Sequence, residues 1–201
     1  MSLEKILAFL KSTPEQRAAD AEARKRVKEF QNTLDVEQGT VVHAARAKNG
    51  NLIAFTESFS DSSMFRVASI NYAAYNLEYA NEEAGSVIVT PEQSPFKEFE
   101  RRRLFSTSVY TEHSGIGIVP HLLWLVYCTL NKDKSIHYVS FSEEGNERLR
   151  PGYEARGYLP LSEERKELFA PKNPYPVLIR DFKEHPLRYA ERRPPKGSII
   201  L

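Results

Sequence analysis

The sequence predicts an α/β fold with a mixed, mostly antiparallel central sheet, flanked by helices and preceded by a helical segment. Short runs that alternate apolar and polar residues, bounded by turn residues, indicate strands. One such run, 104–110, leads through Gly115 and Gly117 into an apolar run, 118–130, that is too long for a strand. A strand that passes through a glycine turn into a helix is typical of sheets covered by helices.

The 201-residue chain has the composition of one globular domain with an appendage. Hydrophobic residues make up 41% of it and charged residues 27%, which is ordinary for a chain with a substantial core. The formal net charge is +1, so no overall field attracts nucleic acid or an anionic membrane, although a local basic patch could. We divide the chain into an N-terminal helical segment 1–36, a domain 37–182 and a basic C-terminal tail 183–201.

Cysteine usage and hydropathy bear on the compartment. Cys128 is the only cysteine, so no disulfide can form within the chain, and we interpret it as a small buried hydrophobe. No apolar stretch reaches the roughly 18 residues of a membrane span, and the N-terminus lacks the pattern of a signal peptide. We expect a cytoplasmic protein without a membrane partner, and the sequence leaves its oligomeric state open.

The N-terminal segment predicts two helices. Residues 2–11 carry apolar side chains at helical spacing, and Thr13 and Pro14 begin a second helix that continues to Leu34. That second helix has few apolar anchors, so we expect it to be largely solvated and to lie across the edge of the domain. A partner-binding appendage is the alternative.

Within the domain, two strands at 40–47 and 52–59 flank an Asn-Gly turn signal and predict a hairpin. A further strand spans 86–90, a buried strand 135–141 and a last strand 175–182. Between these, 65–79 mixes helical and strand signals and stays unassigned. On a helix, Tyr72, Tyr75 and Tyr79 would share one face as core or groove packing.

The glycine turn is a candidate phosphate site. Free N–H groups and the positive end of a helix dipole converge where such a turn opens a helix, and Pro120 suits the first turn. A dinucleotide fingerprint would need a third glycine where Pro120 stands, and a P-loop would need Gly-Lys-Ser or Gly-Lys-Thr. An ordinary tight turn is the alternative.

Two stretches resemble the GNAT superfamily of acyl-CoA-dependent acyltransferases. Residues 112–117 (EHSGIG) are similar to its Q/R-x-x-G-x-G/A loop, and Asn146, Tyr153 and Gly157-Tyr158 resemble its N-x7-Y-x3-G-F signature. The resemblance implies a GNAT-like fold and acetyl-CoA or another acyl-CoA as the cofactor. It implies that the coenzyme is held by His113, Ser114, Gly115, Ile116, Gly117, Ile118 and Asn146.

The resemblance also implies roles in catalysis. Tyr153 would protonate the departing thiolate, and Glu100, with Glu98 on the same strand face, would act as general base toward a small-molecule or protein amine. Pairing of both glutamates with neighbouring cations on a solvated edge is the alternative.

Two departures from the family pattern matter. Glu112 stands where the family has Gln or Arg and brings a negative charge to the loop. Pro151 rules against one continuous helix from Asn146, so we expect a short helix that begins near Pro151 and ends at Gly157. An accidental match at Asn146 is the alternative.

Other functions stay open. The tail 183–201 places arginines around Tyr189, a combination that can hold phosphates and stack a base, and it faintly resembles phage Mom-type enzymes that modify DNA bases on a GNAT-like fold. A non-catalytic module of the same fold is a third possibility. The five histidines show no metal-ligand spacing and no G-x-S-x-G occurs, so we predict neither a metal site nor a serine nucleophile elbow.

Overall fold

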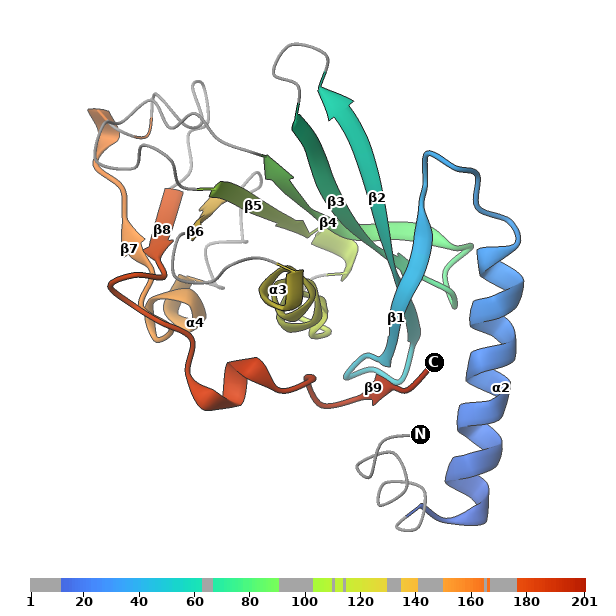
Figure 1. Ribbon diagram of the computed structural model, residues 1–201. Coiled ribbons are helices and arrows are strands. Elements are labelled where there is room, and N and C mark those ends of the chain that lie inside the picture. The colour runs from blue at the N-terminus through green and yellow to red at the C-terminus, as the bar shows by residue number, and fades with distance from the viewer. Residues whose placement is uncertain are drawn as a thin grey trace.

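The protein folds around one mixed sheet with a long helix on each face (Figure 1). The computed structural model describes residues 12–62, 67–90, 103–109, 111–113, 115–129, 135–140, 150–164, 166 and 177–201. The strands in these residues are β1 Thr40–Arg46, β2 Leu52–Ser62, β3 Val67–Asn76, β4 Glu82–Thr90, β5 Arg103–Val109, β6 Ser135–Ser140, β7 Leu159–Pro160, β8 Val177–Asp181 and β9 Ser198–Ile199. The helices are α2 Pro14–Gln31, α3 Ile118–Thr129 and α4 Arg150–Glu154, with 3-10 turns η2 Thr111–His113 and η5 Tyr189–Arg192.

The sheet has the order β7-β8-β6-β5-β4-β3-β2-β1-β9, and its pairs are antiparallel except for β5 and β6. Parallel neighbours cannot be joined by a tight hairpin, and α3 provides the crossover between these two strands. This confirms the predicted fold class, a mixed and mostly antiparallel sheet flanked by helices, as the GNAT resemblance implies. The β1–β2 hairpin is confirmed too, with Gly50 at φ +89° in its turn.

The two faces of the sheet carry separate apolar clusters because side chains alternate along each strand. On β2, Ile53 and Phe55 pack toward α3, whereas Leu52 and Ala54 pack toward α2. Among the helices of the described residues, none combines the length and apolar character of a membrane span.

Helix α2 covers the outer face with a narrow apolar stripe. Thr13 caps it: its side chain accepts from the Gln16 N–H while the Gln16 side chain accepts from the Thr13 N–H, which satisfies two backbone donors. Only Ala23, Val27 and Phe30 of this helix are buried. The helix is largely solvated, as expected, but it packs on a face of the sheet beside β1 and not across the domain edge (Figure 1). Residues 2–11, predicted as the first helix, lie outside the described residues.

The unassigned stretch forms β3, and here the helical interpretation of the tyrosines is wrong. Tyr72 is buried in the cluster beneath α3, Tyr75 contacts α2 on the opposite face, and Tyr79 lies beyond the strand, 60% exposed. A spacing of three to four residues fits a helix locally, but pairing with both β2 and β4 favours the extended chain. Strand β4 also begins earlier than predicted, at Glu82. Cys128 is exposed rather than buried, because it lies on the outer side of α3.

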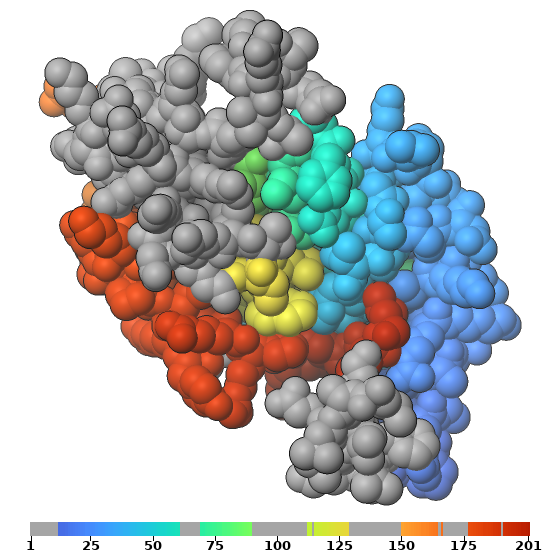
Figure 2. All heavy atoms as spheres, viewed as in Figure 1, coloured from blue at the N-terminus to red at the C-terminus, as the bar shows by residue number. Residues whose placement is uncertain are grey.

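Residues 183–201, expected as a basic tail, run from β8 at one end of the sheet to β9 beside β1 at the other. Figure 2 shows this segment, in red, directly beside the yellow residues of α3. Arg180, 1% exposed, anchors its start: the guanidinium forms an ion pair with Glu191 at 2.8 Å and donates to the carbonyls of His185 and Pro186, each at 3.0 Å. The segment therefore closes over the face that bears α3.

Candidate functional site

The glycine turn joins β5 to α3 as predicted. Gly115 and Gly117 have φ of +80° and +99°, the left-handed region that side chains disfavour, so both positions require glycine for backbone conformation. Helix α3 then begins at Ile118, and its first turn contains no acidic side chain. The first four N–H groups of a helix have no partner within it, so the turn presents backbone donors to an anion.

A hollow of about 180 Å³ opens at this turn. One part of its lining is apolar, with Val119 and Leu123 of α3, and another is cationic, with Lys48 and Arg156. His113, Gly115, Gly117, Ile118, Pro120, Gly152 and Tyr153 complete the lining. An elongated ligand with an anionic part and an apolar part fits such a combination.

Tyr153 reaches this hollow from α4, the short helix predicted to begin near Pro151 and to end at Gly157. Gly157 has φ +87°, which confirms the left-handed cap. The Tyr153 side chain is 7% exposed and meets the Tyr158 ring edge-on, with centroids 5.1 Å apart. Burial raises the pKa of the Tyr153 phenol above its usual value, so the hydroxyl keeps its proton at neutral pH. The phenol therefore stays protonated and is held in the lining of the hollow by packing.

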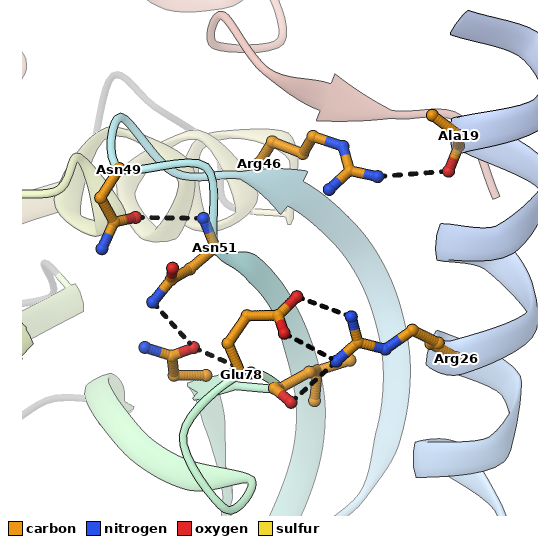
Figure 3. A network of polar contacts seen from close by, with 8 residues as sticks. Ala19, Arg26, Arg46, Asn49, Asn51 and Glu78 are labelled. Carbon is orange, nitrogen blue, oxygen red and sulfur yellow. Dashed lines mark hydrogen bonds and ion pairs between the residues drawn. The ribbon is translucent and has the colours of Figure 1, made fainter. Parts of the chain in front are cut away.

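His113 comes from η2 and is 6% exposed. Its Nδ1 lies 3.5 Å from the side-chain nitrogen of Asn76, which can only donate, so the proton of a neutral ring lies on Nε2. The Asn76 carbonyl oxygen accepts in turn from the Asn51 side chain at 3.4 Å and from the Glu78 N–H at 3.1 Å. Figure 3 shows how this network continues through Glu78 to Arg26 of α2. The network fixes the ring that lines the hollow.

A second hollow of about 500 Å³ lies on the other side of Gly117, between the β1–β2 hairpin and the C-terminal segment. It shares Lys48, Gly117 and Pro120 with the first. Arg46, Ala47, Ile116, His121, Pro195, Lys196 and Gly197 form the rest of its lining. The glycine turn thus separates two adjoining hollows, with a lysine at the junction.

A pair of histidines lies beneath this junction. His43 Nε2 of β1 and His121 Nδ1 of α3 are 3.0 Å apart, the rings are stacked, and both side chains are buried. Burial lowers the pKa of each imidazole to about 4, and in His43 the neighbouring His121 adds to the effect. Both rings are therefore neutral at pH 7, and the N–H of one ring donates a hydrogen bond to the bare nitrogen of the other.

The structure brings together the predicted residues that it describes. His113, Gly115, Gly117, Ile118 and Tyr153 line the first hollow, and Ile116 lines the second. Glu112 is exposed in η2 and lines neither hollow. Ser114, Asn146, Glu98 and Glu100 lie outside the described residues, so their assignments stay predictions.

Sequence reasoning missed Lys48 and Arg156. Arg156 lies three residues after Tyr153 on the same short helical turn, so the spacing within 150–157 could have indicated it. Lys48 sits in a hairpin far from the turn in sequence, and no local signal connects the two. Its backbone N–H donates to the Ile116 carbonyl at 2.9 Å.

Comparison with known proteins gives only distant similarities. No family model matches the chain, and no curated protein sequence does either. Among solved structures, it is similar to a cAMP-binding acyltransferase from Mycobacterium smegmatis, with 10% identity and a TM-score of 0.45 over 85% of this chain and 55% of that one. It is also similar to the spermidine/spermine N-acetyltransferase SpeG from Vibrio cholerae, with 16% identity and a TM-score of 0.38 over 61% of this chain and 69% of that one.

The chain thus spans about half the length of the first of these proteins. TM-scores below 0.5 assign neither a substrate nor an activity to this chain.

Proposed function

We propose that the protein binds an acyl-CoA thioester at the glycine turn and transfers the acyl group to an amine. The observation that carries this proposal is the joint lining of one hollow by a glycine turn at a helix start, two cations and a buried phenol. A diphosphate suits the turn, Lys48 and Arg156, and an uncharged pantetheine arm suits Val119 and Leu123. Tyr153, which lines the same hollow, would then be the proton donor for the thioester sulfur.

The proposed chemistry is direct attack. The amine nitrogen forms a bond to the acyl carbon as the carbon–sulfur bond breaks, and holding both reactants together supplies the largest part of the rate. Tyr153 donates its proton to the departing thiolate. The amine loses its proton to a general base, for which Glu100 and Glu98 stay the predicted candidates.

The C-terminal segment gives no support to the alternative of DNA-base modification. The Arg193 guanidinium lies 4.5 Å from the centroid of the Tyr189 ring, and the Arg188 guanidinium donates to the Ala155 carbonyl. These side chains therefore make contacts within the chain. The amine acceptor and the acyl group stay open.

The test is thermal stabilisation by acetyl-CoA. At a ligand concentration a hundredfold above Kd, binding stabilises the folded state by about 2.7 kcal/mol, which for a chain of this size raises the Tm by roughly 5 to 10 °C. Gly117→Trp should abolish this rise, because the bulky side chain fills the turn at a left-handed position.

The Tm of the ligand-free Gly117→Trp variant reports separately whether it folds. If millimolar acetyl-CoA leaves the Tm of the wild type unchanged, the cofactor assignment is wrong and the non-catalytic module becomes the better interpretation. Release of free thiol in the presence of candidate amines then tests the transfer itself.

A further inference from the structure

The loop at the proposed coenzyme site lacks a cation of its own. Residues 111–121 contain no lysine or arginine, and Glu112 carries a negative charge. Backbone N–H groups supply partial positive charge, but they cannot neutralise a diphosphate alone. The compensating charge therefore has to come from another part of the chain.

Lys48 is placed to supply it. The Cγ, Cδ and Cε atoms of its side chain lie 3.6 to 4.0 Å from the position that a Cβ on Gly117 would occupy, so the stem runs along the turn. Lys48 lines both hollows, at the point where they adjoin. Within the part of the chain that the structure describes, no carboxylate forms an ion pair with its ammonium.

The hairpin holds this lysine in place. The Ala47 N–H donates to the Asn51 carbonyl at 2.9 Å, and the Gly50 N–H donates to the Ala47 carbonyl at 3.0 Å. Figure 3 shows a third bond, in which the Asn49 side chain accepts from the Asn51 N–H at 3.1 Å. Together with the bond from the Lys48 N–H to Ile116, these contacts couple the hairpin tip to the glycine turn. A side chain on a fixed backbone loses less freedom when it meets an anion than one on a mobile loop.

Two of the neighbouring cations, Arg46 and Arg156, have other orientations. Arg46 also lines the second hollow, but its guanidinium donates to the Ala19 carbonyl of α2 at 3.2 Å and is turned toward that helix (Figure 3). Arg156 lines the first hollow on the side of α4 and donates to the Gly152 carbonyl at 2.6 Å.

We infer that Lys48 binds the diphosphate of the acyl carrier and makes the site selective for a carrier that has one. The inference rests on the proposed function and deepens it, since the hairpin replaces the basic or amide side chain that the loop lacks. The substrate class is then a nucleotide-linked thioester, as opposed to a phosphate-free pantetheine thioester.

The experiment compares two thioesters on matched variants. Dissociation constants for acetyl-CoA and for S-acetylpantetheine, which has no phosphate, are measured by thermal-shift titration on the wild type, Lys48→Met, Lys48→Arg and Lys28→Met. Lys28→Met is the control, because it removes the same charge from an exposed position on α2. We expect Lys48→Met to weaken acetyl-CoA binding about 10- to 100-fold, as for loss of one charge-assisted hydrogen bond.

Lys48→Met should bind S-acetylpantetheine as tightly as the wild type does. Lys48→Arg should retain most of the acetyl-CoA affinity. Lys28→Met should change neither dissociation constant more than about twofold. Wild-type affinity of Lys48→Met for acetyl-CoA, or equal loss for both thioesters, overturns the inference while the proposed function stands. Failure of the wild type to bind either thioester overturns the proposed function and the inference together.

Discussion

At the scale of single residues, the first hollow depends on buried polar side chains that come from different elements. His113 is fixed through Asn76, and Tyr153 is fixed by packing against Tyr158. Burying polar groups costs stability unless they have partners, and such groups are retained at sites where their chemistry is used. The fixed orientation of both side chains is what a proton donor and an anion contact require.

Tyr153→Phe tests the donor role. We expect kcat to fall about ten- to a hundredfold and KM for acyl-CoA to change little. This loss is at the low end of the range for general acid catalysis, because a thiolate is a fairly stable leaving group. Since burial holds the pKa of this phenol above its usual value of 10, we expect no inflection from it in the pH–rate profile below pH 10. Steady-state kinetics on the folded variant measure these parameters, and an unchanged kcat would remove Tyr153 from the mechanism.

At the scale of elements, the short strand β9 completes the sheet through a very close backbone approach. The Arg46 N–H donates to the Gly197 carbonyl at 2.8 Å, and a Cβ on Gly197 would lie 2.3 Å from the Arg46 carbonyl oxygen. Gly197 also has φ +92°. Only glycine permits this contact, which brings the C-terminal segment beside β1 and forms one wall of the second hollow.

Gly197→Ala and Gly50→Ala form a matched pair for this contact. Both glycines have positive φ, but a Cβ on Gly50 would meet no atom within 4 Å. We expect Gly50→Ala to cost about 1 to 2 kcal/mol for its conformation alone. Gly197→Ala should cost roughly 2 to 5 kcal/mol, because steric overlap adds to the same strain. Urea denaturation measures both free energies of unfolding, and equal losses would show that the β9 contact contributes nothing.

At the scale of the whole molecule, residues far apart in the sequence meet beneath the site. His43 of β1 stacks on His121 of α3. The Ser198 hydroxyl of β9 lies 3.4 Å from His43 Nε2, the nitrogen that faces His121. Trp124 and Phe55 enclose His43, with ring centroids 4.9 and 5.3 Å away. The pair therefore joins the first strand, the crossover helix and the last strand in one apolar environment that favours neutral rings.

This pair predicts loss of stability in mild acid. The pKa of each ring is about 4 in the folded protein and 6.5 in the unfolded chain. Between pH 6.5 and pH 4, the unfolded chain therefore binds protons that the folded protein does not. The free energy of unfolding falls as the pH is lowered through this range. At pH 5 the effect of one histidine is roughly 2 kcal/mol. In His43→Gln, we expect the decrease in the free energy of unfolding between pH 8 and pH 5 to be smaller than in the wild type by roughly 2 kcal/mol. Denaturation at both pH values measures this, and identical pH dependence of the two proteins would contradict it.

Much of the fold followed from local sequence signals. The strand, glycine turn and helix around Gly117 are present as predicted, as is the Asn-Gly hairpin. The short helix α4 is present too, but it ends at Glu154, and the left-handed Gly157 follows three residues later. These signals are local because a positive φ, a cap or a periodic apolar pattern constrains only the few residues that carry it. Several predicted site residues line the same hollow because they belong to two such segments, the turn that follows β5 and the short helix that follows β6.

The sequence by itself thus determined the glycine turn, the hairpin and the short helix α4, whereas the tertiary structure alone decided what surrounds the turn. The extended state of β3, the place of Lys48 beside Gly117, the His43–His121 pair and the strand β9 all depend on which strands become neighbours. Contacts of this kind join residues at large sequence separation, and no pattern within one segment encodes its partner. They form only when the burial of both sheet faces fixes the strand order and the path of the C-terminal segment.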